Sequence, residues 1–245
     1  MASTHNPVLS RTAFESQAAI GGETMTLGGT MRKTFGLLAL VAAGMVYTWF
    51  GMPGTGLDFT AVYPIAIGST VVALGLYFFI MFRPQYAPVA APIYAAVQGI
   101  VLGILTVIFN ARYPGIAIQA GLLTVATLGV MLVAYRTRVI RVTEKLRSIV
   151  VSCTAAIFVF YLIAFGMSFF GLRIPFLHEG GVIGIGFSLF VTGLAAFNLL
   201  LDFDTIEAGI GTAPEEFEWL AAFGLVVTLI WLYMEMLRLL GKLRR

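Results

Sequence analysis

The sequence predicts an all-α membrane protein, a bundle of seven transmembrane helices. Composition is the first observation: 59% of the 245 residues are hydrophobic and 11% are charged, whereas soluble domains average about 45–50% apolar and about 25% charged residues. The second is that apolar runs of the length needed to cross a bilayer, about 20 residues, recur along the whole chain. The third is that short connections separate these runs, so they leave no room for a soluble domain.

Seven runs meet the length criterion, and turn-forming residues separate the early ones. Met52-Pro53-Gly54 follows the first run, Arg83-Pro84 the second and Tyr113-Pro114-Gly115 the third, all combinations that favour turns. The predicted spans are residues 34–52, 60–82, 89–110, 115–135, 149–171, 181–202 and 217–240. We therefore expect a single transmembrane domain over residues 34–245.

The segment before the first span, residues 1–33, is polar and rich in Gly, Ser and Thr. A cleavable signal peptide would place its apolar core nearer the start of the chain. We predict that 1–33 is a flexible cytoplasmic tail that the mature protein retains. Arg32 and Lys33 then lie next to the first span.

The positive charge of the chain predicts its orientation rather than a nucleic-acid partner. The net charge is +3, but the basic residues lie in the connections and at the C-terminus. Cytoplasmic connections of membrane proteins carry an excess of Lys and Arg. With the N-terminus inside, the inner residues are Arg11, Arg32, Lys33, Arg83, Arg136, Arg138, Arg141, Lys145 and Arg147, and the outer ones are Arg112, Arg173, Arg238, Lys242, Arg244 and Arg245. This balance favours a cytoplasmic N-terminus in a cell membrane.

Several activities lack the residues that they would need. The single cysteine, Cys153, has no partner for a disulfide within the chain. The two histidines, His5 and His178, fall outside the spans, which argues against an intramembrane zinc hydrolase. No lysine lies inside the last span to hold retinal. We expect neither an enzyme nor a resident cofactor, with the bilayer as a partner.

Carboxylates gather where the sixth span ends. Asp202 and Asp204 close this span and Glu207 follows. Ionisable groups at membrane depth are costly and commonly mark ion pathways. Residues two apart on a helix point about 200° apart, so one aspartate would face the bundle and the other headgroups or water. The alternative is that the span ends there and that both carboxylates are solvated.

A further acid, Glu235, lies well inside the last span. Arg238 follows it by three residues, a spacing that brings two side chains together on a helix. One interpretation is a structural Glu235–Arg238 pair that anchors the end of the helix. The other is a functional carboxylate on the cation path. Both stay open.

Several stretches together resemble the Bax inhibitor-1 family of membrane proteins. They are "FDTIE" at the end of span six and the last span, "FEWLAAFGLVVTLIWLYMEMLRLL". The N-terminal "NPVLSR" and the "PIYAAVQGIVLG" of span three are similar to the bacterial, longer-tailed branch of that family. The resemblance covers nearly the whole chain. It implies a seven-helix bundle with the last helix at its centre.

The resemblance also implies an activity, a pH-sensitive calcium or cation leak gated by two aspartates, one each from spans six and seven. The span-six aspartate of the family pattern matches Asp204, and Asp202 is an additional acid. Counted along the chain, the span-seven position falls near Thr228, which cannot ionise, whereas the local pattern Leu-Tyr-x-acid matches Glu235. Asp204 and Asp202 are the candidate Ca²⁺ ligands, with Glu207 as a neighbouring acid.

Two function classes remain after this comparison. The first is a cation leak channel gated by carboxylates at the cytoplasmic end of span six. The alternative is a regulatory membrane protein without transport of its own, which binds a membrane protease or another membrane partner, as some relatives do.

Overall fold

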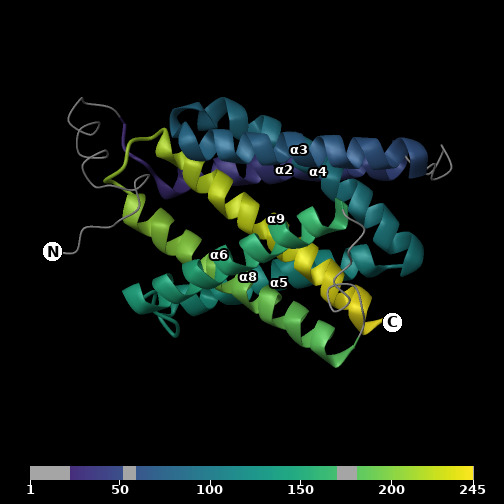
Figure 1. Cartoon of the computed structure of the whole chain (residues 1–245). Coiled ribbons are helices and arrows are strands. Elements are labelled where there is room, and N and C mark those ends of the chain that lie inside the picture. The colour runs from purple at the N-terminus through teal and green to yellow at the C-terminus, as the bar shows by residue number, and fades with distance from the viewer. Residues whose placement is uncertain (1–22, 52–58, 170–180, 245) are drawn as a thin grey trace. The chain divides into compact units, whose positions relative to one another are not determined.

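The computed structural model describes residues 23–51, 59–169 and 181–244 (Figure 1). Throughout these ranges the chain forms long helices joined by short connections. In chain order the elements are α2 (Leu27–Gly51), α3 (Phe59–Phe82), the 3₁₀ turn η2 (Pro84–Tyr86), α4 (Ala87–Arg112), α5 (Ile116–Arg136), α6 (Glu144–Phe169), α8 (Val182–Gly209) and α9 (Phe217–Leu243).

The predicted fold class is confirmed. Within the described residues, 7 helices are long and apolar enough to cross a membrane. Each corresponds to one of the predicted spans. The chain is therefore an all-α membrane protein with seven spans, and the differences from the sequence-based prediction concern where helices begin and end.

The first helix begins earlier than expected. We predicted a flexible tail up to residue 33, but α2 starts at Leu27. The hydroxyl of Thr26 accepts a hydrogen bond from the Gly29 N–H at 3.0 Å, which is the pattern of a helix N-cap. Two glycines in the first turn hid this start in the sequence. The first part of the predicted tail, residues 1–22, lies outside the described residues.

The sixth span extends further than expected. The prediction ended it at residue 202, but α8 continues to Gly209, so Asp202, Asp204 and Glu207 belong to its last turns rather than to a connection. The helix ends where Gly211 adopts a φ of 70°, a left-handed conformation that glycine reaches without strain. A few carboxylates do not stop a helix, because the backbone hydrogen bonds continue until such a residue appears.

The fifth span also begins earlier, at Glu144 rather than at residue 149. The Leu146 N–H donates to the Thr143 hydroxyl at 3.2 Å, so Thr143 caps the helix. The extra turn places Arg147 inside the helix instead of in the preceding loop. The predicted end of this span, residues 170–171, lies outside the described residues.

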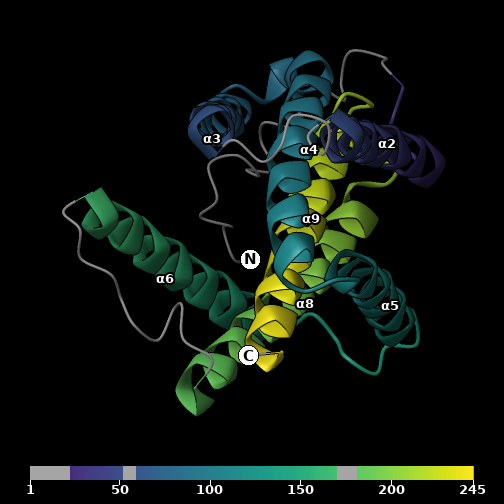
Figure 2. The same ribbon diagram turned by 90° about the vertical axis from the view of Figure 1, so that its right-hand side faces the viewer.

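The described residues divide into two compact units. The first consists of the described residues of Met1–Val107 together with Thr205–Val227. In this unit α4 lies between α2 and α3 (Figure 2). A Cβ on Gly99 would lie 2.4 Å from the Val41 carbonyl oxygen, and one on Gly103 would lie 2.6 Å from Thr48 Cβ. Small residues thus let two membrane helices approach closely, as the Gly99-x-x-x-Gly103 spacing predicts.

The second unit comprises Ile108–Asp204 and Thr228–Arg245, of which the structure describes all but residues 170–180 and 245. Its core joins α6 and α8, and Trp231 of α9 packs against it. The buried residues of this cluster are Val150, Ile157, Val191, Leu194 and Leu201. Hydrocarbon side chains from several helices therefore form the core of this unit.

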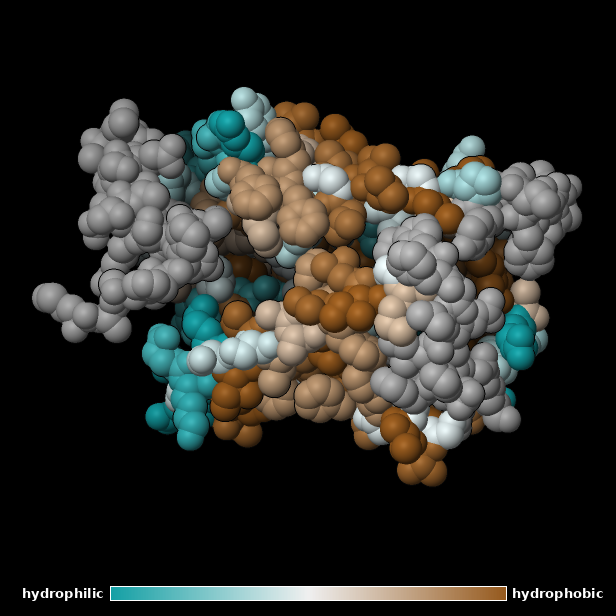
Figure 3. Space-filling model, in the orientation of Figure 1, coloured by the Kyte–Doolittle hydropathy of each residue, from teal (hydrophilic) through white to brown (hydrophobic). Residues whose placement is uncertain are grey.

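The last helix is the most buried of the spans. Buried residues make up 72% of its most apolar window, against 44% or less in each other span. Many side chains of the other helices are apolar and exposed, among them Phe35 (64%), Ile118 (71%) and Leu122 (66%). Such side chains cover wide parts of the face in Figure 3, as expected for surfaces that contact acyl chains.

Candidate functional site

The carboxylate of Asp202 lies within the second unit, next to the last helix. Asp202 itself is partly exposed, but its Oδ2 atom is buried and has no hydrogen-bond partner among the described residues. The hydroxyl of Thr228 hydrogen-bonds to this carboxylate, and Thr228 is 8% exposed. Asp202 therefore keeps one buried oxygen with unused acceptor capacity.

Asp204 is held by different partners. Arg147 of α6 donates from Nη2 to its Oδ2 in an ion pair. The hydroxyl of Tyr135, near the end of α5, lies 3.4 Å from Oδ1. The side chains of Arg147 and Asp204 are 33% and 31% exposed, so this pair is half-exposed. The pair connects α6 with α8, and Arg147 compensates the negative charge of Asp204.

The two aspartates contact different neighbours because they point in different directions, about 200° apart on one helix. The count along the chain placed the family's span-seven position near Thr228, and in the structure Thr228 hydrogen-bonds to Asp202. A residue count cannot follow the rotation of a helix about its axis, and this rotation decides which of two nearby acids meets a given partner.

Glu235 lies in the same unit and is 1% exposed. Its Oε1 accepts hydrogen bonds from Arg238 Nη1 at 2.8 Å, from the Tyr161 hydroxyl at 3.2 Å and from Trp231 Nε1 at 3.2 Å. The predicted contact with Arg238 is confirmed as an ion pair. Its Oε2 is buried and has no hydrogen-bond partner in the part of the chain that the structure describes. Glu235 thus resembles Asp202 in keeping one buried, unused oxygen.

Two other acids belong to the first unit. Glu207 is exposed on the last turn of α8. Glu218, at the start of α9, is 1% exposed and receives the Lys33 ammonium group at 2.7 Å on Oε2. Its Oε1 accepts from the Thr26 N–H at 2.7 Å and from the Thr26 hydroxyl at 2.8 Å. Both oxygens of Glu218 are therefore used.

Backbone contacts strengthen this arrangement, which we call the N-terminal clamp (residues 23–33 and 211–218). Met25 N–H donates to the Ala213 carbonyl at 2.8 Å, and Gly211 N–H donates to the Met25 carbonyl at 2.9 Å. Glu218 lies in the first turn of α9, but it also binds the N-terminus of α2 through Thr26. A carboxylate is favoured there by the helix dipole.

Asp202 and Asp204, the candidate Ca²⁺ ligands, have different partners. Ca²⁺ takes about 6–8 oxygen ligands. No group of three or more His, Cys, Asp or Glu that could hold a metal ion occurs in the described residues. Asp202 and Asp204, the expected ligands, contact Thr228 and Arg147 respectively instead of converging.

The sequence did not reveal several partners of these carboxylates. Arg147 was counted only as a loop charge, yet the Thr143 cap that brings it into α6 is a recognisable signal. Tyr161 and Trp231 were not connected with Glu235. Trp231 lies four residues before Glu235, a spacing that favours contact on a helix, whereas nothing in the sequence indicates Tyr161.

Comparison with known proteins agrees with these features. The family model described as "Bax inhibitor 1 like" matches residues 6–245, and therefore all seven spans and every carboxylate discussed above. A search of the curated proteins found no significant match. Because the match covers nearly the whole chain, this multi-pass membrane protein belongs to the Bax inhibitor 1 like family.

Proposed function

We propose that this protein is a pH-sensitive leak pathway for cations, with Ca²⁺ as the expected substrate, and that it is not an enzyme. The observation that carries the proposal is the pair of buried, unpartnered oxygens, Asp202 Oδ2 and Glu235 Oε2. Unsatisfied buried polar atoms are rare in folded proteins and call for an explanation. Carboxylates inside membrane spans commonly mark ion paths, and carboxylate oxygens are ligands that Ca²⁺ accepts.

The small number of ligands suits conduction. An ion that moves along a path must bind well enough to enter and weakly enough to leave. A single free carboxylate oxygen at each position leaves most of the ion's coordination shell to water. Asp202 and Glu235 are therefore proposed as successive weak contacts rather than as a closed binding cage.

The Asp204–Arg147 pair has a different proposed role. Because Tyr135 and Arg147 occupy both of its oxygens, Asp204 is a poor ligand for a cation in this state. We propose that the pair holds α6 to α8 and acts as the gate, so that the carboxylates near the end of span six still control the leak. Of the two candidate Ca²⁺ ligands, we therefore propose that Asp202 rather than Asp204 contacts the ion in this state.

Calcium flux into proteoliposomes across a pH series from about 6 to 8 tests the proposal, because carboxyl groups at functional sites commonly titrate outside their ordinary range. We expect Asp202→Asn and Glu235→Gln each to lower flux about tenfold, which corresponds to about 1.4 kcal/mol in the barrier. Asp202→Asn should also flatten the pH profile, since an amide cannot exchange the proton. Glu216→Gln removes an exposed carboxylate and is the matched control.

A second comparison separates ligand from gate. If Asp204 and Arg147 form the gate, Asp204→Asn and Arg147→Gln should change flux in the same direction. If Asp204 were a ligand, removing Arg147 should increase flux and removing Asp204 should decrease it. Wild-type protein that gives no flux above empty vesicles at any pH would overturn the channel and leave a regulatory membrane protein, with a membrane protease or similar partner.

The leak needs an orientation, and we propose a cytoplasmic N-terminus in a bacterial plasma membrane. The excess of Lys and Arg on that side supports it. Single cysteines in a Cys153→Ala background, labelled from outside intact cells, test it. Position 140 should stay unlabelled and position 113, in a connection on the opposite side, should react. Labelling of position 140 from outside would contradict the proposed orientation and indicate the opposite one.

A further inference from the structure

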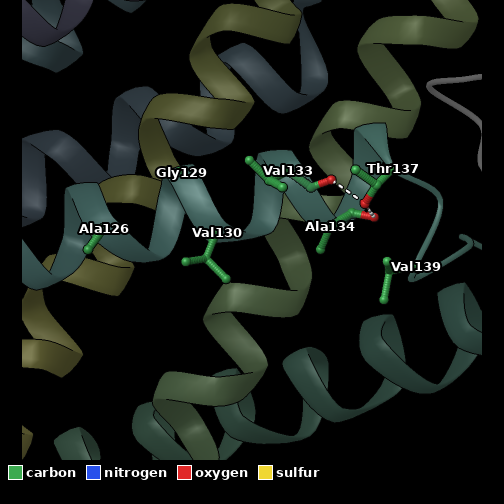
Figure 4. A pocket seen from close by; sticks show the side chains of 7 residues that line it. All are labelled: Ala126, Gly129, Val130, Val133, Ala134, Thr137 and Val139. Carbon is green, nitrogen blue, oxygen red and sulfur yellow. Dashed lines mark hydrogen bonds between the residues drawn. The ribbon is translucent and has the colours of Figure 1, made fainter.

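A shallow apolar groove of about 500 Å³ runs along one face of α5 in the second unit (Figure 4). Its lining residues are Ala126, Gly129, Val130, Val133, Ala134, Thr137 and Val139. The one hydroxyl among them is satisfied internally, because Thr137 donates to the Val133 carbonyl at 2.7 Å. The groove therefore presents methyl groups and a glycine, with nothing to attract water.

The groove has the dimensions of one leaflet of a bilayer. From Ala126 to Thr137 the helix rises about 16 Å at about 1.5 Å per residue. Half of a hydrocarbon core of about 30 Å is about 15 Å. Gly129 forms the notch in its middle, since no atom lies within 4 Å of where its Cβ would be. An extended acyl chain lying along α5 fits this length.

Uncompensated positive charge lies at one end of the groove. Thr137 and Val139 line this end of the groove. Three exposed arginines lie beside them in the chain: Arg136, Arg138 and Arg141. Within the described ranges none of these arginines forms an ion pair. Exposed Lys145 adds a fourth positive charge and exposed Glu144 one negative charge, so the segment stays strongly basic.

We propose that this groove binds an anionic phospholipid, with one acyl chain along α5 and the phosphate at the arginines. Charge complementarity selects this occupant, because a neutral lipid or a transmembrane helix would leave the arginines without a counterion. Basic residues next to a membrane surface contribute about 1 kcal/mol each to the binding of anionic lipid. Val139, which is 79% exposed, would be covered by the glycerol end of the acyl chain.

Native mass spectrometry of the full-length protein tests the site with phosphatidylglycerol and phosphatidylcholine of identical acyl chains. We expect wild type to retain phosphatidylglycerol at least about tenfold more tightly. The triple variant Arg136→Gln, Arg138→Gln, Arg141→Gln should lose that preference. The matched control is a triple variant that removes the same charge elsewhere: Arg32→Gln, Arg83→Gln and Arg112→Gln.

A second pair of variants tests the groove without changing charge. Gly129→Leu should fill the notch and weaken phosphatidylglycerol binding about tenfold, as expected when an apolar contact of this size is lost. Gly121→Leu adds the same side chain at another open position of α5 and should have no effect.

Equal retention of both lipids by wild type would overturn the proposal, as would a triple variant no weaker than its control. An unchanged Gly129→Leu variant would indicate surface attraction alone, and displacement by millimolar glycerol 3-phosphate would indicate a small-anion site; either result would also overturn it.

Discussion

Glu218 and Glu235 are the same residue type on the same helix, and each is 1% exposed. Each has a cationic partner, Lys33 at 2.7 Å and Arg238 at 2.8 Å. They differ in how their oxygens are used. Glu218 accepts bonds on both oxygens, whereas Glu235 accepts all of its bonds on Oε1 and leaves Oε2 buried and unused.

This difference teaches how to separate structural from functional carboxylates in a membrane protein. Burial and ion pairing are common to both glutamates, so neither property identifies a site. Unused acceptor capacity does distinguish them, because it costs free energy that only a ligand, a proton or water would recover. By this criterion Asp202 belongs with Glu235, the other proposed contact on the cation path, and Glu218 belongs to the scaffold.

The largest effect is expected where the carboxylate is fully used. Glu218→Ala leaves the largely buried Lys33 with Glu215, which is 46% exposed, as its remaining ion-pair partner. Removing one member of a buried pair costs about 3–5 kcal/mol, so we expect a loss of about 3 kcal/mol in the free energy of unfolding. Unfolding in mixed detergent micelles measures it. Glu216→Ala, at an exposed position, is the control and should lose less than about 0.5 kcal/mol.

Two adjacent glycines, Gly28 and Gly29, give a steric test of the position of the Glu218 carboxylate. A Cβ on Gly29 would lie 2.0 Å from Glu218 Oε2, whereas nothing lies within 4 Å of one on Gly28. Gly29→Ala should therefore push the Glu218 carboxylate out of place and cost about 1–3 kcal/mol. Gly28→Ala should be neutral or stabilise by up to about 1 kcal/mol, since alanine favours helix. Equal melting temperatures for the two variants would contradict the clamp geometry.

A smaller effect is expected at Glu235, because Arg238 is 41% exposed and can return to water. We expect Glu235→Gln to cost about 1–2 kcal/mol, since the amide still occupies the site but no longer pairs with charge. The double variant with Arg238→Gln should recover part of this loss. Strictly additive losses in the thermal unfolding cycle would mean that the two residues are not coupled.

The smallest stability effect is expected at the half-exposed pair. Arg147→Gln and Asp204→Asn should each cost about 1 kcal/mol or less, as is usual for exposed ion pairs. Their effect on calcium flux should nevertheless exceed that of Glu218→Ala in the fraction that remains folded. If neither variant changed the calcium flux, the proposed gate would be contradicted and the pair would be a surface ion pair without a role in transport.

Local sequence signals predicted most of the fold. Apolar runs gave the seven spans, the spacing of Gly99 and Gly103 indicated close helix packing, and the three-residue spacing of Glu235 and Arg238 predicted their ion pair. Each of these depends on residues close together in the chain. The structure departs from the prediction at the starts of α2 and α6 and at the end of α8. At these points helix caps and a left-handed glycine, rather than hydrophobicity, set the helix boundaries.

The partners of the carboxylates were mostly beyond reach of the sequence. Lys33 and Glu218 are separated by 185 positions, and Arg147 and Asp204 by 57. Such pairs depend on how whole helices rotate and pack. The same reason explains why Asp202 rather than Asp204 meets Thr228: a half-turn of one helix exchanges their roles without changing any sequence pattern.

The N-terminal clamp also has a consequence for biosynthesis. Lys33 leaves the ribosome 185 residues before its partner Glu218, a delay of about 10–40 s at translation rates of about 5–20 residues per second. During that interval the first helix must reside in the membrane with its lysine held by water or headgroups. The Lys33–Glu218 ion pair therefore cannot form until the last helix has been made. A ribosome that stalls before residue 218 leaves a nascent chain in which the first helix lacks this contact.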